Sequence, residues 1–125
     1  MSFTTKHLSP ECDVLAPDGS EVRLLAATAN GSMTHFKLHP GQTSKAMRHR
    51  TVDELWFVIA GRGEMWRSIN SHEEITPLTV GVSISIPVGA SFQFRCVGVH
   101  AFEAVAVTMP PWPGPDEAVA ADGTW

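Results

Sequence analysis

A histidine and a glutamate in one apolar stretch are the residues of this sequence best suited to chemistry. His49 precedes Glu54 by five positions in "AMRHRTVDELWF". An imidazole and a carboxylate held close together can bind a metal ion, move protons or orient a bound molecule. They can also simply satisfy one another as buried polar groups. We favour contact with a ligand or a metal, because polar groups in a concave site are common handles for ligands.

Short strands must position these side chains. Runs rich in Val, Ile, Phe and Thr recur about every ten residues and are separated by Gly, Pro, Asn or Asp. No long stretch has helical periodicity, so the pattern predicts an all-β antiparallel sandwich or closed barrel. The predicted strands cover residues 21–28, 32–38, 45–49, 54–60, 63–69, 82–87, 91–97 and 100–108.

Two stretches resemble the motifs of the cupin superfamily. The first motif, Gly-x5-His-x-His-x3–4-Glu-x6-Gly, is matched in spacing by Gly41, His49, Glu54 and Gly61. Met47 stands where the first histidine belongs. The chain therefore keeps the glycines of this motif and only part of its polar set.

The second motif, Gly-x5-Pro-x-Gly-x2-His-x3-Asn, is matched at Gly81, Pro87 and Gly89. Phe92 replaces its histidine and Cys96 its asparagine. The resemblance implies a double-stranded β-helix, or jelly-roll barrel. We expect a single cupin domain over residues 1–125, with the barrel at about 20–108 and an extended, Pro-rich tail at 109–125.

In metal-binding cupins, three imidazoles and one carboxylate would hold a divalent ion. Here His49 and Glu54 remain, whereas the Met47 thioether suits copper(I) better than iron, manganese or zinc, and Phe92 offers no ligand atom. Two protein ligands fall short of the roughly three that catalytic sites use. The sequence therefore predicts a degenerate metal site without a tightly held cofactor. A divalent metal bound by His49, Glu54 and an unidentified third ligand is the alternative.

The same positions predict a pocket. Residues two apart in a strand share a face, so Met47 and His49 point the same way, and Glu54 and Trp56 share parity on the next strand. Phe92 and Phe94 share a face as well. Glu54 beside His49 would raise the pKa of the imidazole. The predicted ligand-binding residues are Met47, His49, Glu54, Trp56, Phe92 and Phe94.

The remaining histidines are poorer candidates. Phe36 and Leu38 take the inward parity of their strand, so His35 and His39 are expected on the surface. His100 opens a run that is apolar on both parities, so its direction stays open.

Two arginines and a glutamate lie within predicted strands. Arg67 and Arg95 are expected on the outer face, because Phe92 and Phe94 claim the parity opposite to Arg95. Glu103 lies among alanines and valines, where pairing with one of these arginines would explain its presence. The sequence does not decide between the arginines.

The tail cannot be a central strand, because its prolines lack the donor that a sheet requires. We expect it to lie over the barrel or a neighbouring subunit with Trp112 as its anchor; a flexible tail is the alternative. Trp112 and Trp125 suit an interface, and we expect a homodimer.

Composition excludes several classes of partner. The 125 residues carry a formal charge of −4 with scattered bases, which argues against nucleic acid and anionic membranes. Cys12 and Cys96 are expected to be reduced. The N-terminus lacks the apolar centre of a secretory signal, so we expect a cytoplasmic protein.

Two functions remain from this reasoning. The first is a cupin that binds a small organic molecule in its barrel. The second is a metal-dependent oxygenase or isomerase that uses His49 and Glu54. The resemblance to cupins also implies a third possibility, a metal-free acid–base enzyme like the cupin sugar epimerases, which use a histidine base and a tyrosine acid. It ranks below the other two, because this chain has no tyrosine. Whether the protein is an enzyme is left open.

Overall fold

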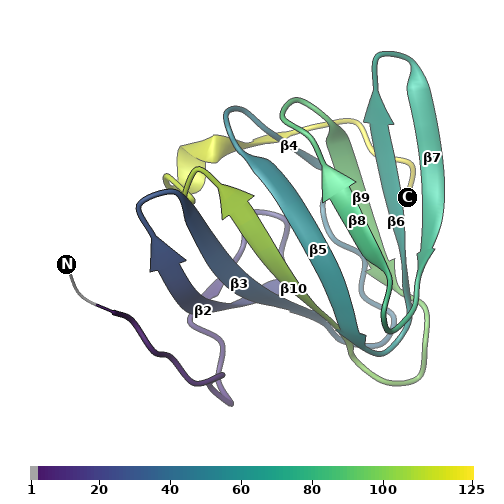
Figure 1. Cartoon of the computed structure of the whole chain (residues 1–125). Coiled ribbons are helices and arrows are strands. Elements are labelled where there is room, and N and C mark those ends of the chain that lie inside the picture. The colour runs from purple at the N-terminus through teal and green to yellow at the C-terminus, as the bar shows by residue number, and fades with distance from the viewer. Residues whose placement is uncertain (1–2) are drawn as a thin grey trace.

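Two antiparallel sheets face one another in the computed structural model, which describes residues 3–125 (Figure 1). The six-stranded sheet has the order β1-β2-β3-β10-β5-β8, and the five-stranded sheet has the order β11-β4-β9-β6-β7. The strands are β1 (Val14–Leu15), β2 (Glu21–Thr28), β3 (Gly31–Leu38), β4 (Met47–His49), β5 (Asp53–Ala60), β6 (Gly63–Ile69), β7 (His72–Leu78), β8 (Ser83–Ile86), β9 (Ser91–Cys96), β10 (Phe102–Met109) and β11 (Ala118–Ala120). A 3-10 turn, η1 (Pro115–Glu117), precedes β11.

The core lies between the two sheets and follows the alternation of the strands. Along β5, Glu54, Trp56 and Val58 are buried, whereas Asp53 and Leu55 are exposed. Strands β8 and β10 alternate in the same way. This period of two confirms the all-β prediction and turns one row of each strand toward the interior.

All eight predicted strands are present, with ends shifted by up to two residues, but β7 and the short edge strands β1 and β11 were missed. β7 is the longest of the three. Its sequence begins His72-Glu73-Glu74 and contains Pro77, which resembles a loop. β7 lies at the edge of its sheet and pairs only with β6, which is where a strand tolerates proline and charge.

The motif glycine Gly61 is required by close packing after β5. Its φ is +73°, and a Cβ at this position would lie 2.2 Å from the backbone oxygen of Ala101. Any other residue would push the chain before β10 away from β5.

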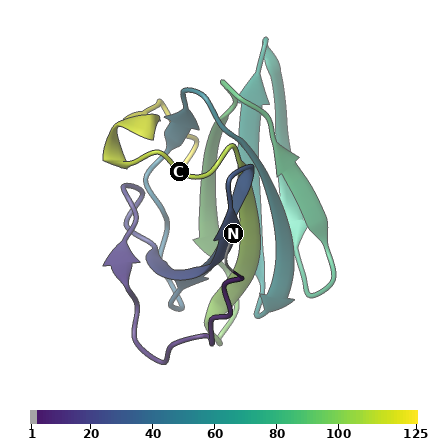
Figure 2. The ribbon, with the colours of Figure 1, turned by 60° about the vertical axis from the view of Figure 1, so that its left-hand side comes forward.

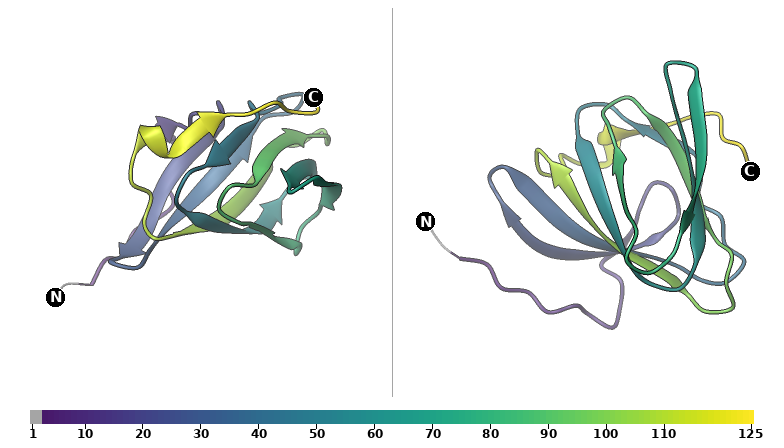
Figure 3. Two further views of the ribbon diagram at one scale, coloured as in Figure 1. Left: turned by 90° about the horizontal axis from the view of Figure 1, so that it is seen from above. Right: turned by 45° about the vertical axis from the view of Figure 1, so that its right-hand side comes forward.

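Segments outside the main strands wrap the barrel. The N-terminal segment, in purple, lies outside the barrel (Figures 1 and 2). The tail, in yellow, leaves β10, forms η1 and pairs through β11 with the edge of β4 (Figure 3). It therefore lies on its own barrel and adds an edge strand rather than a central one.

Membrane-spanning helices and the state of the two cysteines can be read from residues 3–125. No helix in that range is long and apolar enough to cross a membrane. Cys12 is exposed and Cys96 is buried, and both are free thiols.

Candidate functional site

A cavity of about 420 Å³ lies between the sheets at the end covered by the tail. Its walls are mainly apolar, and neither lysine nor arginine is among the residues that line it. The lining residues are Val14, Leu15, Ala16, Pro17, Asp18, Val22, Thr34, Phe36, Met47, His49, Glu54, Trp56, Phe92, Thr108, Trp112, Pro115 and Ala118.

β4 and β9 bring three of the motif positions together. Met47 and His49 are buried, whereas Arg48 between them is exposed. Met47 pairs directly with Phe92 across the two strands. The Phe92 ring meets the His49 imidazole edge to face, with centroids 4.9 Å apart. The two apolar replacements in the motifs therefore flank the remaining histidine.

β5 supplies the carboxyl group. Glu54 is 2% exposed, and its Oε1 atom lies 3.4 Å from Nδ1 of His49. The two groups are not aligned for a hydrogen bond, so His49 Nδ1 has no hydrogen-bond partner. Glu54 Oε2 and the indole Nε1 of Trp56 are also buried without a partner. Polar atoms of this kind need an explanation, because nearly all such atoms in folded proteins are satisfied.

Burial shifts both titrating groups toward their neutral forms. Desolvation lowers the pKa of His49 from 6.5 to about 4. Desolvation also raises the pKa of Glu54 from 4.5 to about 8, although the neighbouring Trp56 side chain opposes this shift. Trp56 therefore lies near the carboxyl group, but no well-aligned hydrogen bond joins Trp56 Nε1 to Glu54. The prediction that Glu54 would raise the pKa of His49 is therefore wrong, since a protonated carboxyl group offers the imidazole no negative charge.

Segments outside the predicted barrel complete the walls, and sequence reasoning did not assign them to the site. The Trp112 ring meets the His49 imidazole at 75°, with centroids 5.2 Å apart. Its place as an anchor of the tail was predicted, but its contact with the motif histidine was not.

The turn before β2 forms another part of the wall. Asp18 is buried, and its Oδ1 accepts hydrogen bonds from the backbone N–H and the hydroxyl of Ser20, at 2.9 and 2.6 Å. Burial raises its pKa. The Asp-Gly pair at Asp18 predicted only a turn, so no signal in the sequence assigned this carboxyl group to the cavity.

Phe94 does not line the cavity, which corrects the prediction that it forms part of the pocket. Its ring packs against Trp56 at 80° with a centroid distance of 4.8 Å, and lies 6.1 Å from Phe102. Phe94 has the predicted inward parity, but Trp56 and Phe102 enclose it in the core.

The donor set does not fit a tightly held divalent metal. Across residues 3–125, no group of three or more His, Cys, Asp or Glu side chains is arranged to hold an ion. His49 and Glu54 are the only members of the first motif that supply hard or borderline ligand atoms, and Met47 and Phe92 fill the remaining positions with apolar groups.

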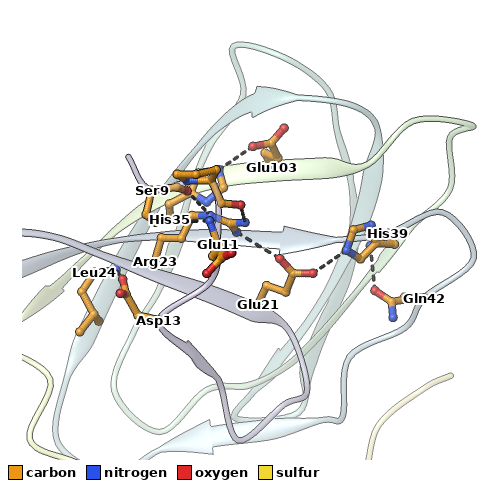
Figure 4. Close-up of polar contacts among 11 residues, drawn as sticks. Ser9, Glu11, Asp13, Glu21, Arg23, Leu24, His35, His39, Gln42 and Glu103 are labelled. Carbon is orange, nitrogen blue, oxygen red and sulfur yellow. Dashed lines mark hydrogen bonds and ion pairs between the residues drawn. The ribbon is translucent and has the colours of Figure 1, made fainter. Parts of the chain in front are cut away.

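His35 and His39 have different surroundings, although both were expected on the surface. His39 is exposed, and its Nε2 contacts Glu21 at 2.5 Å. His35 is 1% exposed, which contradicts the prediction. It does face away from the cavity, and its Nε2 lies 2.7 Å from Glu103 Oε1 (Figure 4).

The N-terminal segment explains why His35 is buried. Arg23, which pairs with His35 across β2 and β3, donates to the backbone oxygens of Ser9 and Pro10 at 2.7 and 2.9 Å. This anchors the segment over the outer face of the sheet, as Figure 4 shows. Glu103 therefore pairs with a histidine and not with the arginines that sequence reasoning considered.

Neither Arg67 nor Arg95 lines the cavity. Arg95 has the predicted outer parity, but the prediction is wrong for Arg67, which pairs with Phe92 and so shares its inward face. Arg67 donates to the backbone oxygen of Ser85 at 2.8 Å, and Arg95 donates to Glu64 Oε1 at 2.7 Å. The guanidinium of Arg95 also lies 4.1 Å from the centre of the Trp125 ring. His100 lies exposed in the loop before β10.

Solved structures share this fold at low sequence identity. An uncharacterized protein with a double-stranded beta-helix domain from Klebsiella pneumoniae is 19% identical, with a TM-score of 0.70 over 95% of this chain and 91% of that one. KdgF from Halomonas sp. is 14% identical, with a TM-score of 0.69 over 84% and 94%. A recombinant oxalate oxidase in complex with glycolate is 20% identical, with a TM-score of 0.76 over 94% and 62%.

A search of curated proteins finds no match to this sequence. The sequence model of the Cupin domain family matches residues 34–108, which is more than half of the chain. That range includes both motifs and the strands that carry His49, Glu54 and Phe92. The protein therefore belongs to the cupin superfamily.

Proposed function

We propose that this cupin binds a small organic molecule in the cavity between its sheets. The observation that carries the proposal is a set of four buried polar atoms without partners around that cavity: Thr34 Oγ1, His49 Nδ1, Glu54 Oε2 and Trp56 Nε1. A buried polar atom without a partner costs about 1–3 kcal/mol. A ligand that supplied the missing hydrogen bonds would remove part of this cost.

The size and lining of the cavity support the same proposal. Its volume of about 420 Å³ lies within the range of roughly 300–1,000 Å³ typical of small-molecule sites. Such sites are mostly apolar and contain a few convergent polar groups. The solved oxalate oxidase holds glycolate, which is an example of a small ligand in a protein of this fold.

The proposal can be tested by filling the cavity with a larger side chain and comparing the result with the same substitution outside the cavity. Ala118 on β11 lines the cavity, whereas Ala120 on the same strand is exposed and does not. We expect Ala118→Trp to abolish the binding of compounds found by ligand-observed NMR, and Ala120→Trp to leave it unchanged. Binding that persists in a folded Ala118→Trp variant would place the ligand elsewhere.

Metal analysis of the purified protein separates this proposal from a metal-dependent enzyme. We expect substoichiometric iron, manganese, zinc and copper, because His49 and Glu54 alone provide too few ligands. A stoichiometric ion that is lost in His49→Ala would overturn this expectation.

We also propose that the protein is a homodimer that pairs through the outer face of the six-stranded sheet. Met33, Leu55, Phe57, Ile59 and Met109 lie on this face and are between 37% and 50% exposed. Large apolar side chains that are exposed together on one face commonly mark an interaction site.

The strand register supports one continuous patch. Val107 on β10 pairs with both Met33 on β3 and Leu55 on β5, and Val105 pairs with Phe57. A second copy presents the same apolar face, and a two-fold interface joins identical surfaces of the two subunits. Trp112 and Trp125, on which the sequence prediction of a dimer rested, contact their own chain.

Light scattering coupled to size-exclusion chromatography tests the dimer. We expect the wild type at twice the chain mass of 13.5 kDa and Phe57→Lys at the chain mass. Ile75→Lys is the control, because Ile75 is 51% exposed on β7 of the other sheet. A monomeric wild type, or dissociation of the Ile75→Lys variant alone, would contradict the proposed face.

A further inference from the structure

We propose that the cavity selects an uncharged, ring-bearing molecule with a hydrogen-bond acceptor and a donor at one end, and that it rejects organic anions. The inference rests on the proposed function and names the chemical class of the ligand. It is argued from the charges, rings and unpartnered atoms that line the cavity.

The charges of the lining argue against an anion. The cavity contains the carboxyl groups of Asp18 and Glu54 and has no lysine or arginine in its wall. His49 is the only histidine in the lining, and the rings of Phe92 and Trp112 pack against its imidazole. A buried carboxylate or phosphate would therefore lose its hydration without gaining a counter-charge, which is costly.

The hydrogen-bonding groups argue against an organic cation. The buried Trp56 indole N–H lies near the Glu54 carboxyl group but has no well-aligned acceptor, and an ammonium group has no lone pair to offer it. Asp18 Oδ1 is already occupied by Ser20.

The unpartnered atoms specify what an uncharged ligand must provide. Trp56 Nε1 requires an acceptor, and Thr34 Oγ1 can donate or accept. Glu54 Oε2, on β5, and His49 Nδ1, on β4 of the other sheet, both belong to residues that line the cavity and can exchange hydrogen bonds with a ligand that carries both a donor and an acceptor. A primary amide is one simple group with both.

The rings specify the rest of the molecule. Phe36 and Trp56 stack with centroids 5.0 Å apart and planes 11° from parallel. Phe92 and Trp112 approach from the opposite strands and the tail, on either side of His49. Walls made of aromatic rings favour a flat apolar body, which can stack or meet their edges.

Three probes of nearly equal shape test this inference: benzamide, benzoate and benzamidinium. They differ chiefly in charge and in the donors and acceptors of one end. We expect benzamide to bind at millimolar or lower concentration at pH 6.5, and each charged probe to bind at least about tenfold more weakly, by isothermal titration calorimetry.

Variants connect the preference to named atoms. Glu54→Gln keeps a neutral polar group and should change benzamide affinity by less than about threefold. Trp56→Phe removes the indole N–H and should weaken benzamide by about fivefold, the effect of one hydrogen bond. If Trp56→Phe does not fold, Thr34→Val can replace it. This nearly isosteric change removes the unpartnered Oγ1 of Thr34 and should also weaken benzamide binding.

The outcomes separate this inference from the proposed function. Preference for benzoate or benzamidinium would overturn the inference and leave a small-molecule site in place. If none of the probes binds, and a broader set of neutral compounds also fails in the wild type, the proposed function falls and the inference with it.

Discussion

His49 Nδ1 lies 3.4 Å from Glu54 Oε1 inside the cavity, yet no aligned hydrogen bond joins them. Each group is buried, and each has its pKa displaced toward its neutral form, to about 4 for His49 and about 8 for Glu54. Two neutral groups at this distance form a polar patch without net charge. Unlike an ion pair, the two groups lose stability when pH brings either of them to its charged form.

The stability of the protein should depend on this pair. Because the pKa of Glu54 is raised, the folded state retains a proton that the unfolded chain releases, so stability falls as pH rises from about 4.5 to about 8. His49 acts in the opposite sense, because its lowered pKa makes stability rise with pH from about 4 to 6.5. Above pH 6.5 the effect of Glu54 is no longer opposed by His49. We expect the free energy of unfolding to fall by about 2 kcal/mol between pH 6.5 and 8, measured by urea denaturation.

Substitution identifies the group responsible for this slope. Glu54→Gln removes the titration and should flatten the dependence above pH 6.5. Asp122→Asn, at an exposed position, should retain the full slope. A slope that survives in Glu54→Gln would assign the dependence to another group, such as Asp18, whose pKa is also raised by burial.

Removal of the Trp112 ring should open the cavity to water. The ring covers one side of His49, and we expect Trp112→Ala to lower the free energy of unfolding by about 2 kcal/mol. Hydration of the imidazole should also move the pKa of His49 upward toward 6.5, which NMR titration of its ring protons would detect. Trp112→Phe keeps an aromatic edge and should retain most of both properties. An unchanged His49 pKa in Trp112→Ala would show that other groups exclude water.

Two substitutions should rebuild a metal site. Met47 and Phe92 are directly paired across β4 and β9, His49 lies two residues after Met47 on β4, and the Phe92 ring contacts its imidazole. Met47→His together with Phe92→His would place three imidazoles and Glu54 around one point, which is enough for zinc or cobalt. We expect the double variant to bind one Co²⁺ per chain, with visible absorption bands. The same variant carrying His49→Ala should bind at least about tenfold more weakly. Equal Co²⁺ binding by the wild type would contradict our account of the motif replacements.

Gln93 should hold the last residues of the described chain against β9. Its Nε2 donates to the backbone oxygens of Ser44 and Trp125, and its Oε1 accepts from the N–H groups of Thr124 and Trp125. Gln93→Leu removes all four hydrogen bonds and should cost about 3 kcal/mol.

Hydrogen exchange gives the matching local measurement. In Gln93→Leu, the amides of Thr124 and Trp125 should lose their protection. Gln93→Glu keeps an oxygen acceptor for these two amides and should preserve more of their protection than Gln93→Leu does. Full protection in Gln93→Leu would mean that other contacts, such as the Arg95 guanidinium over the Trp125 ring, are sufficient.

The sequence predicted the parts of the site that depend on strand parity. Met47, His49, Glu54, Trp56 and Phe92 line one cavity, because period-two alternation and the motif spacing determine their direction. Alternation does not determine depth, and this is why Phe94 has the predicted direction but lies in the core beyond Trp56.

Predictions failed where segments distant in sequence meet. His35 points away from the cavity as predicted, but the segment around Ser9 and Pro10 covers it. No local pattern indicates that an irregular segment will lie over a strand. The predicted direction of the His49 pKa shift was wrong for a related reason. Desolvation dominates this shift, and it depends on all the residues that surround the imidazole and not on the neighbouring carboxyl group alone.

The cavity is walled partly by the turn at 14–18 and the tail at 112–118, and both lie outside the range 34–108 that the family signature covers. The two segments include β1 and the first residue of β11, edge strands that each pair on one side only. Changes in them would leave the pairing of the strands between them in place. Two members with the same signature need not recognise the same compound.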